Sequence, residues 1–163
     1  MTLTVAAELA MSASFVVFII VAFLYVMPWA RTVDAREAMV AFLGVHIFRH
    51  VALQLVSAQH FGFAISDAGR DEIVYGDLVG TVLALTALVA VNRQWKMWRP
   101  LTWLFVVATT VDLANALVVG LREELFAQAQ NVSWLILTFY VPLLWVTLAL
   151  VVWVLVAPRG RAH

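Results

Sequence analysis

A short stretch of the chain, residues 44–54 (GVHIFRHVALQ), carries polar side chains inside a segment that is otherwise apolar. They are His46, Arg49, His50 and Gln54. A charged side chain that faces hydrocarbon is costly, so such residues usually turn inward, pair with other groups and belong to a functional site. The stretch therefore predicts a buried polar site whose chemistry depends on the groups it meets.

Two histidines in this stretch have a spacing that suits a metal ion. His46 and His50 are four residues apart, which places both side chains on one face of an α-helix. Asp77 and Asp112, in later apolar segments, could supply oxygen ligands. Nitrogen and oxygen ligation without sulfur suits iron, copper(II), zinc or manganese. The predicted metal ligands are His46, His50, Asp77 and Asp112.

Charge balance also favours a cation at this site. Glu8, Asp77 and Asp112 place three negative charges in apolar segments. Arg49 supplies a single positive charge against them. Because unbalanced charge is costly inside a membrane, the surplus calls for protons or a bound cation.

Two alternatives to a non-haem metal site stay open. Haem is the less favoured cofactor, because His46 and His50 would share a helix face and could not bind both sides of one porphyrin. The other alternative needs no ligand: Arg49 pairs with Asp77 or Asp112, and the buried ion pairs fix the positions of the helices.

Further polar side chains lie at a similar depth, in the same half of the predicted membrane segments. They are candidates for binding a substrate or for balancing charge: Arg49, Asn115, Glu8, Gln54 and Tyr140. Five separate segments contribute polar groups to this one level. We take this convergence as the strongest functional signal in the sequence, since scattered structural hydrogen bonds would have no reason to share a depth.

The composition identifies the class of protein. Hydrophobic residues make up 64% of the 163 residues, charged residues 12%, and the mean hydropathy is +0.97, which indicates an integral membrane protein. The net charge is zero, so we expect no nucleic-acid partner. The absence of cysteine excludes disulfides, thiolate metal sites and iron–sulfur clusters.

Five apolar runs are long enough to cross a bilayer, which takes about 20 residues each. They span residues 5–29, 38–56, 73–91, 101–121 and 134–157. We therefore predict an all-α bundle of five transmembrane helices that forms one domain, residues 1–163.

The basic residues of the connecting segments predict an orientation. One side collects Arg31, Arg36, Arg93, Lys96, Arg99, Arg159 and Arg161, whereas only Arg70 and Arg122 fall on the other. Short cytoplasmic loops carry the excess of Lys and Arg, so we expect the N-terminus outside and the C-terminus in the cytoplasm, in an inner or plasma membrane.

A stripe of small residues marks one face of the third span. Gly76, Gly80 and Ala84 recur at every fourth position. Such a stripe lets a neighbouring helix backbone approach closely, so we expect this face to point into the bundle.

Three functions are compatible with these features, and the sequence leaves open whether the protein is an enzyme. The first is a membrane-bound redox enzyme or redox subunit with a metal or cofactor in the polar site, acting on a small or lipid-soluble substrate. The second is a non-catalytic accessory subunit in which the polar network holds the helices together. It would contact other membrane subunits or a second copy of itself. The third is a proton-coupled transporter of a small solute, which the scarcity of polar residues towards the inner side disfavours.

Overall fold

The computed structural model describes residues 1–157, and within this range the chain forms helices and no strands. The first span comprises α1 (Leu3–Val21), η1 (Ala22–Val26) and α2 (Met27–Thr32); the second comprises α3 (Ala35–Ile47), η2 (Phe48–Leu53) and α4 (Gln54–His60). The third span is α5 (Asp67–Asn92) and the fourth is α6 (Trp98–Arg122). After the short α7 (Leu125–Gln128), the fifth span comprises α8 (Asn131–Leu135), η3 (Ile136–Tyr140) and α9 (Val141–Val156).

The prediction of an all-helical fold is confirmed for the described residues, and five of their helices are long and apolar enough to cross a membrane. Most observed helices extend beyond the predicted apolar runs, because backbone hydrogen bonding continues into the polar flanks. The third span shows the reason clearly. Its apolar run begins at Ile73, but the helix begins at Asp67, where the Ser66 hydroxyl accepts a hydrogen bond from the backbone N–H of Gly69 at 3.0 Å.

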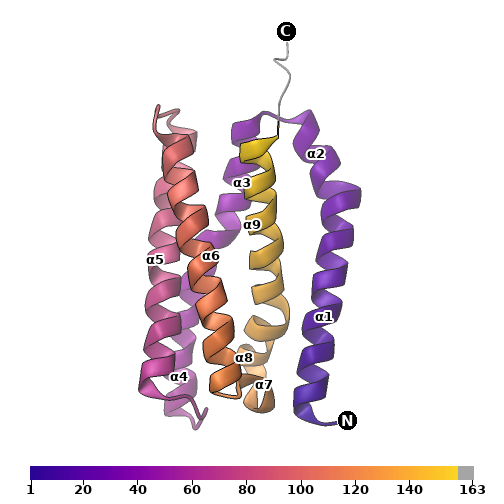
Figure 1. Ribbon diagram of the computed structural model, residues 1–163, viewed down its shortest axis with the longest axis vertical. Helices are drawn as coiled ribbons and strands as arrows, with labels where there is room; N and C mark the ends of the chain where they lie inside the picture. Colours follow the sequence, from indigo (N-terminus) through magenta and orange to yellow (C-terminus); the bar gives the residue numbers. More distant parts are fainter. Residues whose placement is uncertain (158–163) are drawn as a thin grey trace.

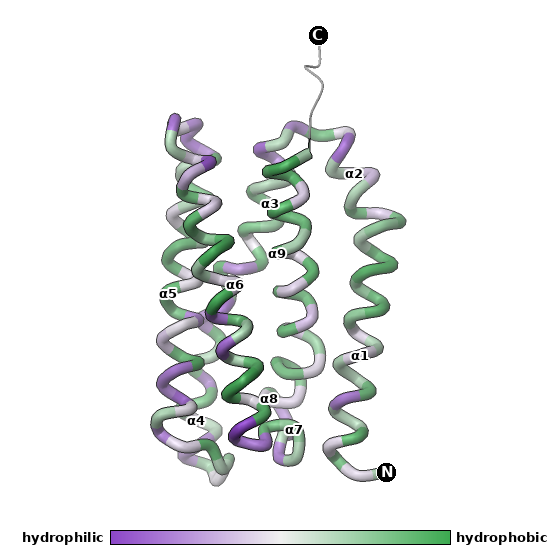
Figure 2. The backbone as a smooth tube through the Cα atoms, viewed as in Figure 1, coloured by the Kyte–Doolittle hydropathy of each residue, from purple (hydrophilic) through white to green (hydrophobic). Residues whose placement is uncertain are grey.

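The helices run roughly along one long axis, with the N-terminus and the end of α9 at opposite ends of the bundle (Figure 1). Below, these are called the N-terminal end and the C-terminal end. Hydrophobic residues follow the lengths of the helices, and many of the hydrophilic ones gather towards the two ends (Figure 2). This distribution is what a membrane-spanning bundle requires, because polar groups belong near the water on either side.

The main apolar core lies between α3, α5, α6 and α9, around fully buried residues such as Met39, Leu43 and Phe105. A smaller apolar cluster, which includes Leu55, Phe63 and Leu125, forms near the N-terminal end. The first span stands at the edge of the bundle (Figure 1), and its buried residues are alanines alone. Val26 and Met27 of this span are only partly buried where they pack against the core, and many of its other apolar side chains are exposed.

Three of the five spans contain a segment that is not regular α-helix. Both η1 and η3 are π-helical, and each is followed two residues later by a proline, Pro28 and Pro142. A proline has no N–H to donate to the carbonyl four residues before it, and its ring crowds that carbonyl, so the preceding turn widens. The third segment, η2, is a tight 3₁₀ helix in the middle of the second span.

The basic residues of the loops segregate along the axis as the sequence suggested. The helix ends and connections at the C-terminal end carry Arg31, Arg36, Arg93, Lys96 and Arg99, whereas Arg70 and Arg122 lie in the helix ends at the N-terminal end. Arg159 and Arg161 lie outside the described residues. The sidedness, with the N-terminus outside and the C-terminus in the cytoplasm, stays a prediction.

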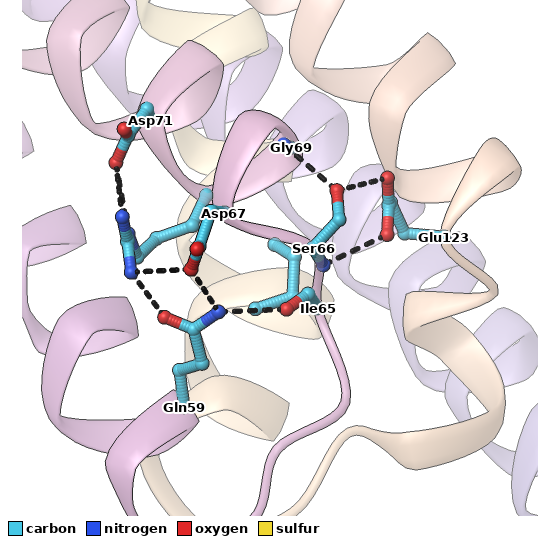
Figure 3. Close-up of polar contacts among 8 residues, drawn as sticks. Gln59, Ile65, Ser66, Asp67, Gly69, Asp71 and Glu123 are labelled. Carbon is cyan, nitrogen blue, oxygen red and sulfur yellow. Dashed lines mark hydrogen bonds and ion pairs between the residues drawn. The ribbon is translucent and has the colours of Figure 1, made fainter.

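Polar contacts tie the loops together at the N-terminal end (Figure 3). The backbone N–H and the hydroxyl of Ser66 both donate to the carboxylate of Glu123, at 3.0 and 2.8 Å. Beside them, Arg70 contacts Asp67, Asp71 and the side-chain oxygen of Gln59. The start of α5 is thereby joined both to the end of α4 and to the loop that follows α6.

The Ser66–Glu123 contact makes the stability of this end depend on pH. The hydrogen bonds from Ser66 hold the pKa of Glu123 below its ordinary value of 4.5. Because the folded-state pKa is the lower one, the contribution to stability is present above pH 4.5 and is lost as the pH falls through the folded-state pKa.

We predict that Glu123→Gln lowers the thermal unfolding midpoint at neutral pH and makes the midpoint fall less steeply below pH 4.5 than in the wild type. The measurement is thermal unfolding of the purified protein in neutral detergent across this pH range. The matched control is Glu124→Gln, which changes the adjacent, exposed carboxylate. Equal pH profiles for Glu123→Gln and the wild type would contradict the prediction.

Candidate functional site

A fully buried arginine joins three spans in the interior of the bundle. Arg49 lies in η2, its side chain has 0% exposure, and its Nε and Nη2 both lie 2.7 Å from Oδ1 of Asp77 in α5. Its Nη2 also donates to Oδ2 of Asp112 in α6, and its Nη1 donates to the hydroxyl of Thr109 at 3.1 Å. We call Arg49, Asp77 and Asp112 the Arg49 triad. Charge-assisted bonds of this kind are among the strongest hydrogen bonds that proteins form.

The small residues of α5 make room for the triad. A Cβ atom added at Gly80 would lie 2.5 Å from Nη1 of Arg49, and one added at Gly76 would lie 1.6 Å from Oδ1 of Asp112. The stripe Gly76–Gly80–Ala84 therefore faces the bundle, as predicted, but at the two glycines the expected reason is wrong. Side chains of the polar network, and not a neighbouring backbone, occupy the space that these glycines leave.

His46 is fully buried in α3, three residues before Arg49 in the sequence and closer to the C-terminal end of the bundle. Its Nε2 lies 3.1 Å from the hydroxyl of Thr147, and its ring meets the ring of Phe105 edge to face. Its Nδ1 has no hydrogen-bond partner among the described residues. His46 thus joins the second span to the fourth and the fifth.

The prediction that His46 and His50 share one face is wrong. His50 is exposed, and its Nδ1 lies 3.0 Å from the backbone carbonyl of Ile47 in its own segment. The cause is η2, which has three residues per turn, so that residues four apart do not align there as they do in an α-helix. The sequence spacing was correct, but the helix type that it assumed does not hold at this point.

The remaining candidates divide into those near the triad and those away from it. Tyr140 is partly buried and donates its hydroxyl hydrogen to the carbonyl of Val45 at 3.0 Å. Gln54 is partly buried, and its Nε2 has no partner among the described residues. Glu8 and Asn115 are exposed, so neither belongs to the buried network.

The part of the chain that the structure describes contains no group of three or more His, Asp or Glu side chains placed to hold a metal ion. Asp77 and Asp112 are bound to Arg49 instead, and His50 is exposed whereas His46 is buried. Iron, copper, zinc, manganese and haem therefore stay predictions without support from this geometry. The alternative in which Arg49 pairs with Asp77 or Asp112 is closer to the observed contacts, since Arg49 pairs with both.

An apolar cavity of about 90 Å³ lies beside the triad, towards the N-terminal end. Its polar lining residues are Asp77, Ser133 and Tyr140, and all others are apolar side chains or glycine. Two of the irregular segments form part of its wall: η2 through Val51 and Ala52, and η3 through residues that include Tyr140.

Sequence reasoning identified Asp77 and Tyr140 but missed the cavity. Its walls come from all five spans, from Phe63 in the loop between α4 and α5, and from Phe126 in the short helix α7. No single segment has a residue pattern that predicts such a cavity. The nearest signal was Pro142, which follows the π-helical segment η3 in the cavity wall.

Residues 6–156 match the family model described as a domain of unknown function (DUF8737). No curated protein matches the chain, and no solved structure matches it.

The glycine at position 80 allows a direct test of the packing around Arg49. We predict that Gly80→Ala destabilises the protein by about 1–3 kcal/mol, because the added methyl group overlaps the guanidinium. The matched control is Gly44→Ala, where an added Cβ meets nothing within 4 Å. The measurement is unfolding of both variants in detergent, and equal stabilities would contradict the geometry.

A second prediction concerns charge in the triad. We expect Arg49→Met to cost about 3–5 kcal/mol of stability, because it leaves two carboxylates in the interior without their partner. The triple variant Arg49→Met/Asp77→Asn/Asp112→Asn removes all three charges and should recover a large part of this loss. An Arg49→Met protein as stable as the wild type would show that the triad does not hold the spans together.

Proposed function

Because the chain belongs to the DUF8737 family, whose function is unknown, we propose a function from the geometry of the chain itself: it is a membrane-embedded binding protein for a small lipid-soluble ligand. The apolar part of the ligand occupies the cavity beside the Arg49 triad, and its polar group meets Asp77 and Tyr140. The observation that carries the proposal is the cavity, which combines apolar walls with these two polar groups.

The composition of the cavity wall supports this class of ligand. A site that is mostly apolar, with a small number of placed polar groups, has the usual character of a small-molecule pocket. A volume of about 90 Å³ is enough for a short alkyl group but less than the ~150 Å³ apolar cavity that holds benzene in another protein. The proposal is therefore limited to a small ligand, or to one end of a longer molecule.

The triad contributes by fixing the position of Asp77. A lone carboxylate on a membrane helix would be costly and mobile, whereas Asp77 is held by two nitrogen atoms of Arg49. Both contacts reach Oδ1, so Oδ2 is the oxygen of Asp77 that can serve a ligand. In this proposal the ion pairs are the scaffold and the cavity is the binding site.

The irregular segments in the cavity wall also favour a binding role. Stretches of 3₁₀ and π helix within longer α-helices occur frequently at functional sites. Here η2 carries Arg49 and η3 carries Tyr140, and both line the cavity or adjoin it. The roles as redox enzyme, accessory subunit and proton-coupled transporter stay predictions.

Binding can be measured with a small neutral probe, trifluorobutanol, by fluorine NMR of the protein in neutral maltoside micelles. We expect saturable binding that butanol displaces. Ala116→Leu, which places a larger side chain in the cavity wall, should weaken binding about tenfold or more, which corresponds to about 1.4 kcal/mol.

The matched control is Ala114→Leu, the same change at an exposed position of the same helix α6. It should leave binding unchanged. The proposal fails if neither trifluorobutanol nor its amine counterpart, trifluorobutylamine, binds saturably to the wild type, or if the Ala116→Leu and Ala114→Leu variants bind alike.

A further inference from the structure

The polar edge of the cavity restricts the head group of the ligand. We infer that the ligand is a small hydrophobic amine whose ammonium group binds between Asp77 and Tyr140. This inference rests on the proposed binding function and adds to it the chemical class of the ligand. It follows from an inventory of donors and acceptors at the cavity and from the charge of the Arg49 triad.

The polar groups that line the cavity offer acceptors to a ligand. The Tyr140 hydroxyl donates its hydrogen to the carbonyl of Val45, so its oxygen can still accept a hydrogen bond from a ligand. The Ser133 hydroxyl donates to the backbone carbonyl of Gln130 and accepts from the backbone N–H of the same residue, so it is engaged in its own turn. An ionised Asp77 accepts only. A ligand that matches this edge must therefore donate.

The nearest cation is already committed to other partners. Arg49 directs Nε and Nη2 to Asp77, Nη2 also to Asp112, and Nη1 to Thr109. It does not line the cavity. A ligand with a carboxylate or phosphate group would find no donor at this edge and would face the carboxylate of Asp77, so anionic ligands are disfavoured.

The charge of the triad points the same way. Two carboxylates face one guanidinium, which leaves a surplus of one negative charge in the interior of a membrane-spanning bundle. A ligand that arrives from the bilayer gains little from apolar burial, because the lipid tails are as apolar as the cavity wall. Selectivity must then come from the polar edge, and an ammonium group supplies both the missing positive charge and the hydrogen-bond donors.

A proton on Asp77 would neutralise the same charge without any ligand. The two cases differ in their preference for a head group. An ionised Asp77 prefers an ammonium, whereas a protonated Asp77 has no surplus charge to offer, and an alcohol of the same size then binds equally well.

The experiment compares trifluorobutylamine with trifluorobutanol, which differ only in the head group, by fluorine NMR in neutral maltoside micelles at neutral pH. On the wild type we expect the amine to bind about tenfold more tightly than the alcohol, as a charge-assisted bond requires. In Asp77→Asn this ratio should fall to about one. Glu8→Gln, which removes an exposed carboxylate from α1, should keep the wild-type ratio.

Each outcome decides one of the two proposals. If both probes bind the wild type equally, the ammonium inference is overturned and the binding function stands. If neither binds saturably, the binding function itself fails. Should Asp77→Asn not fold, Tyr140→Phe replaces it, because it removes one acceptor and keeps the charge: the ratio should fall several-fold, and an unchanged ratio would overturn the assigned place of the ammonium.

Discussion

The structure depends on one requirement: the charge of Arg49 has to be balanced inside an apolar bundle. A guanidinium has five N–H donors and cannot lose its proton in a protein, so it must find acceptors wherever it is buried. Here the acceptors come from α5 and α6, while Arg49 itself comes from η2. The interaction therefore fixes three helical segments relative to one another. The local geometry of these segments has to bring Arg49, Asp77 and Asp112 within hydrogen-bond distance.

Two features of the helices serve this requirement. Glycines at positions 76 and 80 of α5 leave the volume that Asp112 and Arg49 occupy. The second span changes from α to 3₁₀ geometry at the residues that carry Arg49. A regular helix with larger side chains would not leave space for the same contacts, so the polar network and the local backbone are parts of one arrangement.

The proposed binding site borders the Arg49 triad. Asp77 belongs both to the triad and to the cavity wall, so in the proposed function it is the residue that would contact both Arg49 and a bound ligand. A cation bound at Asp77 would compete with Arg49 for this carboxylate, and Arg49 also contacts Asp112 in α6. This physical link makes the charge of the ligand, more than its apolar bulk, the property that the bundle would sense.

The sequence by itself determined the number of helices long enough to cross a membrane and the inward face of the third one. It also identified Arg49, Asp77 and Asp112 as candidates for a buried polar site. Both results follow because hydropathy and the cost of buried charge are local properties. It could not determine which groups pair. His50 illustrates the limit. Whether it shares a helix face with His46 depends on a 3₁₀ segment that no residue pattern in this stretch predicts. The cavity depended on tertiary structure as well. Its walls come from five spans and two connecting segments, so its volume and polar edge exist only once the helices are packed.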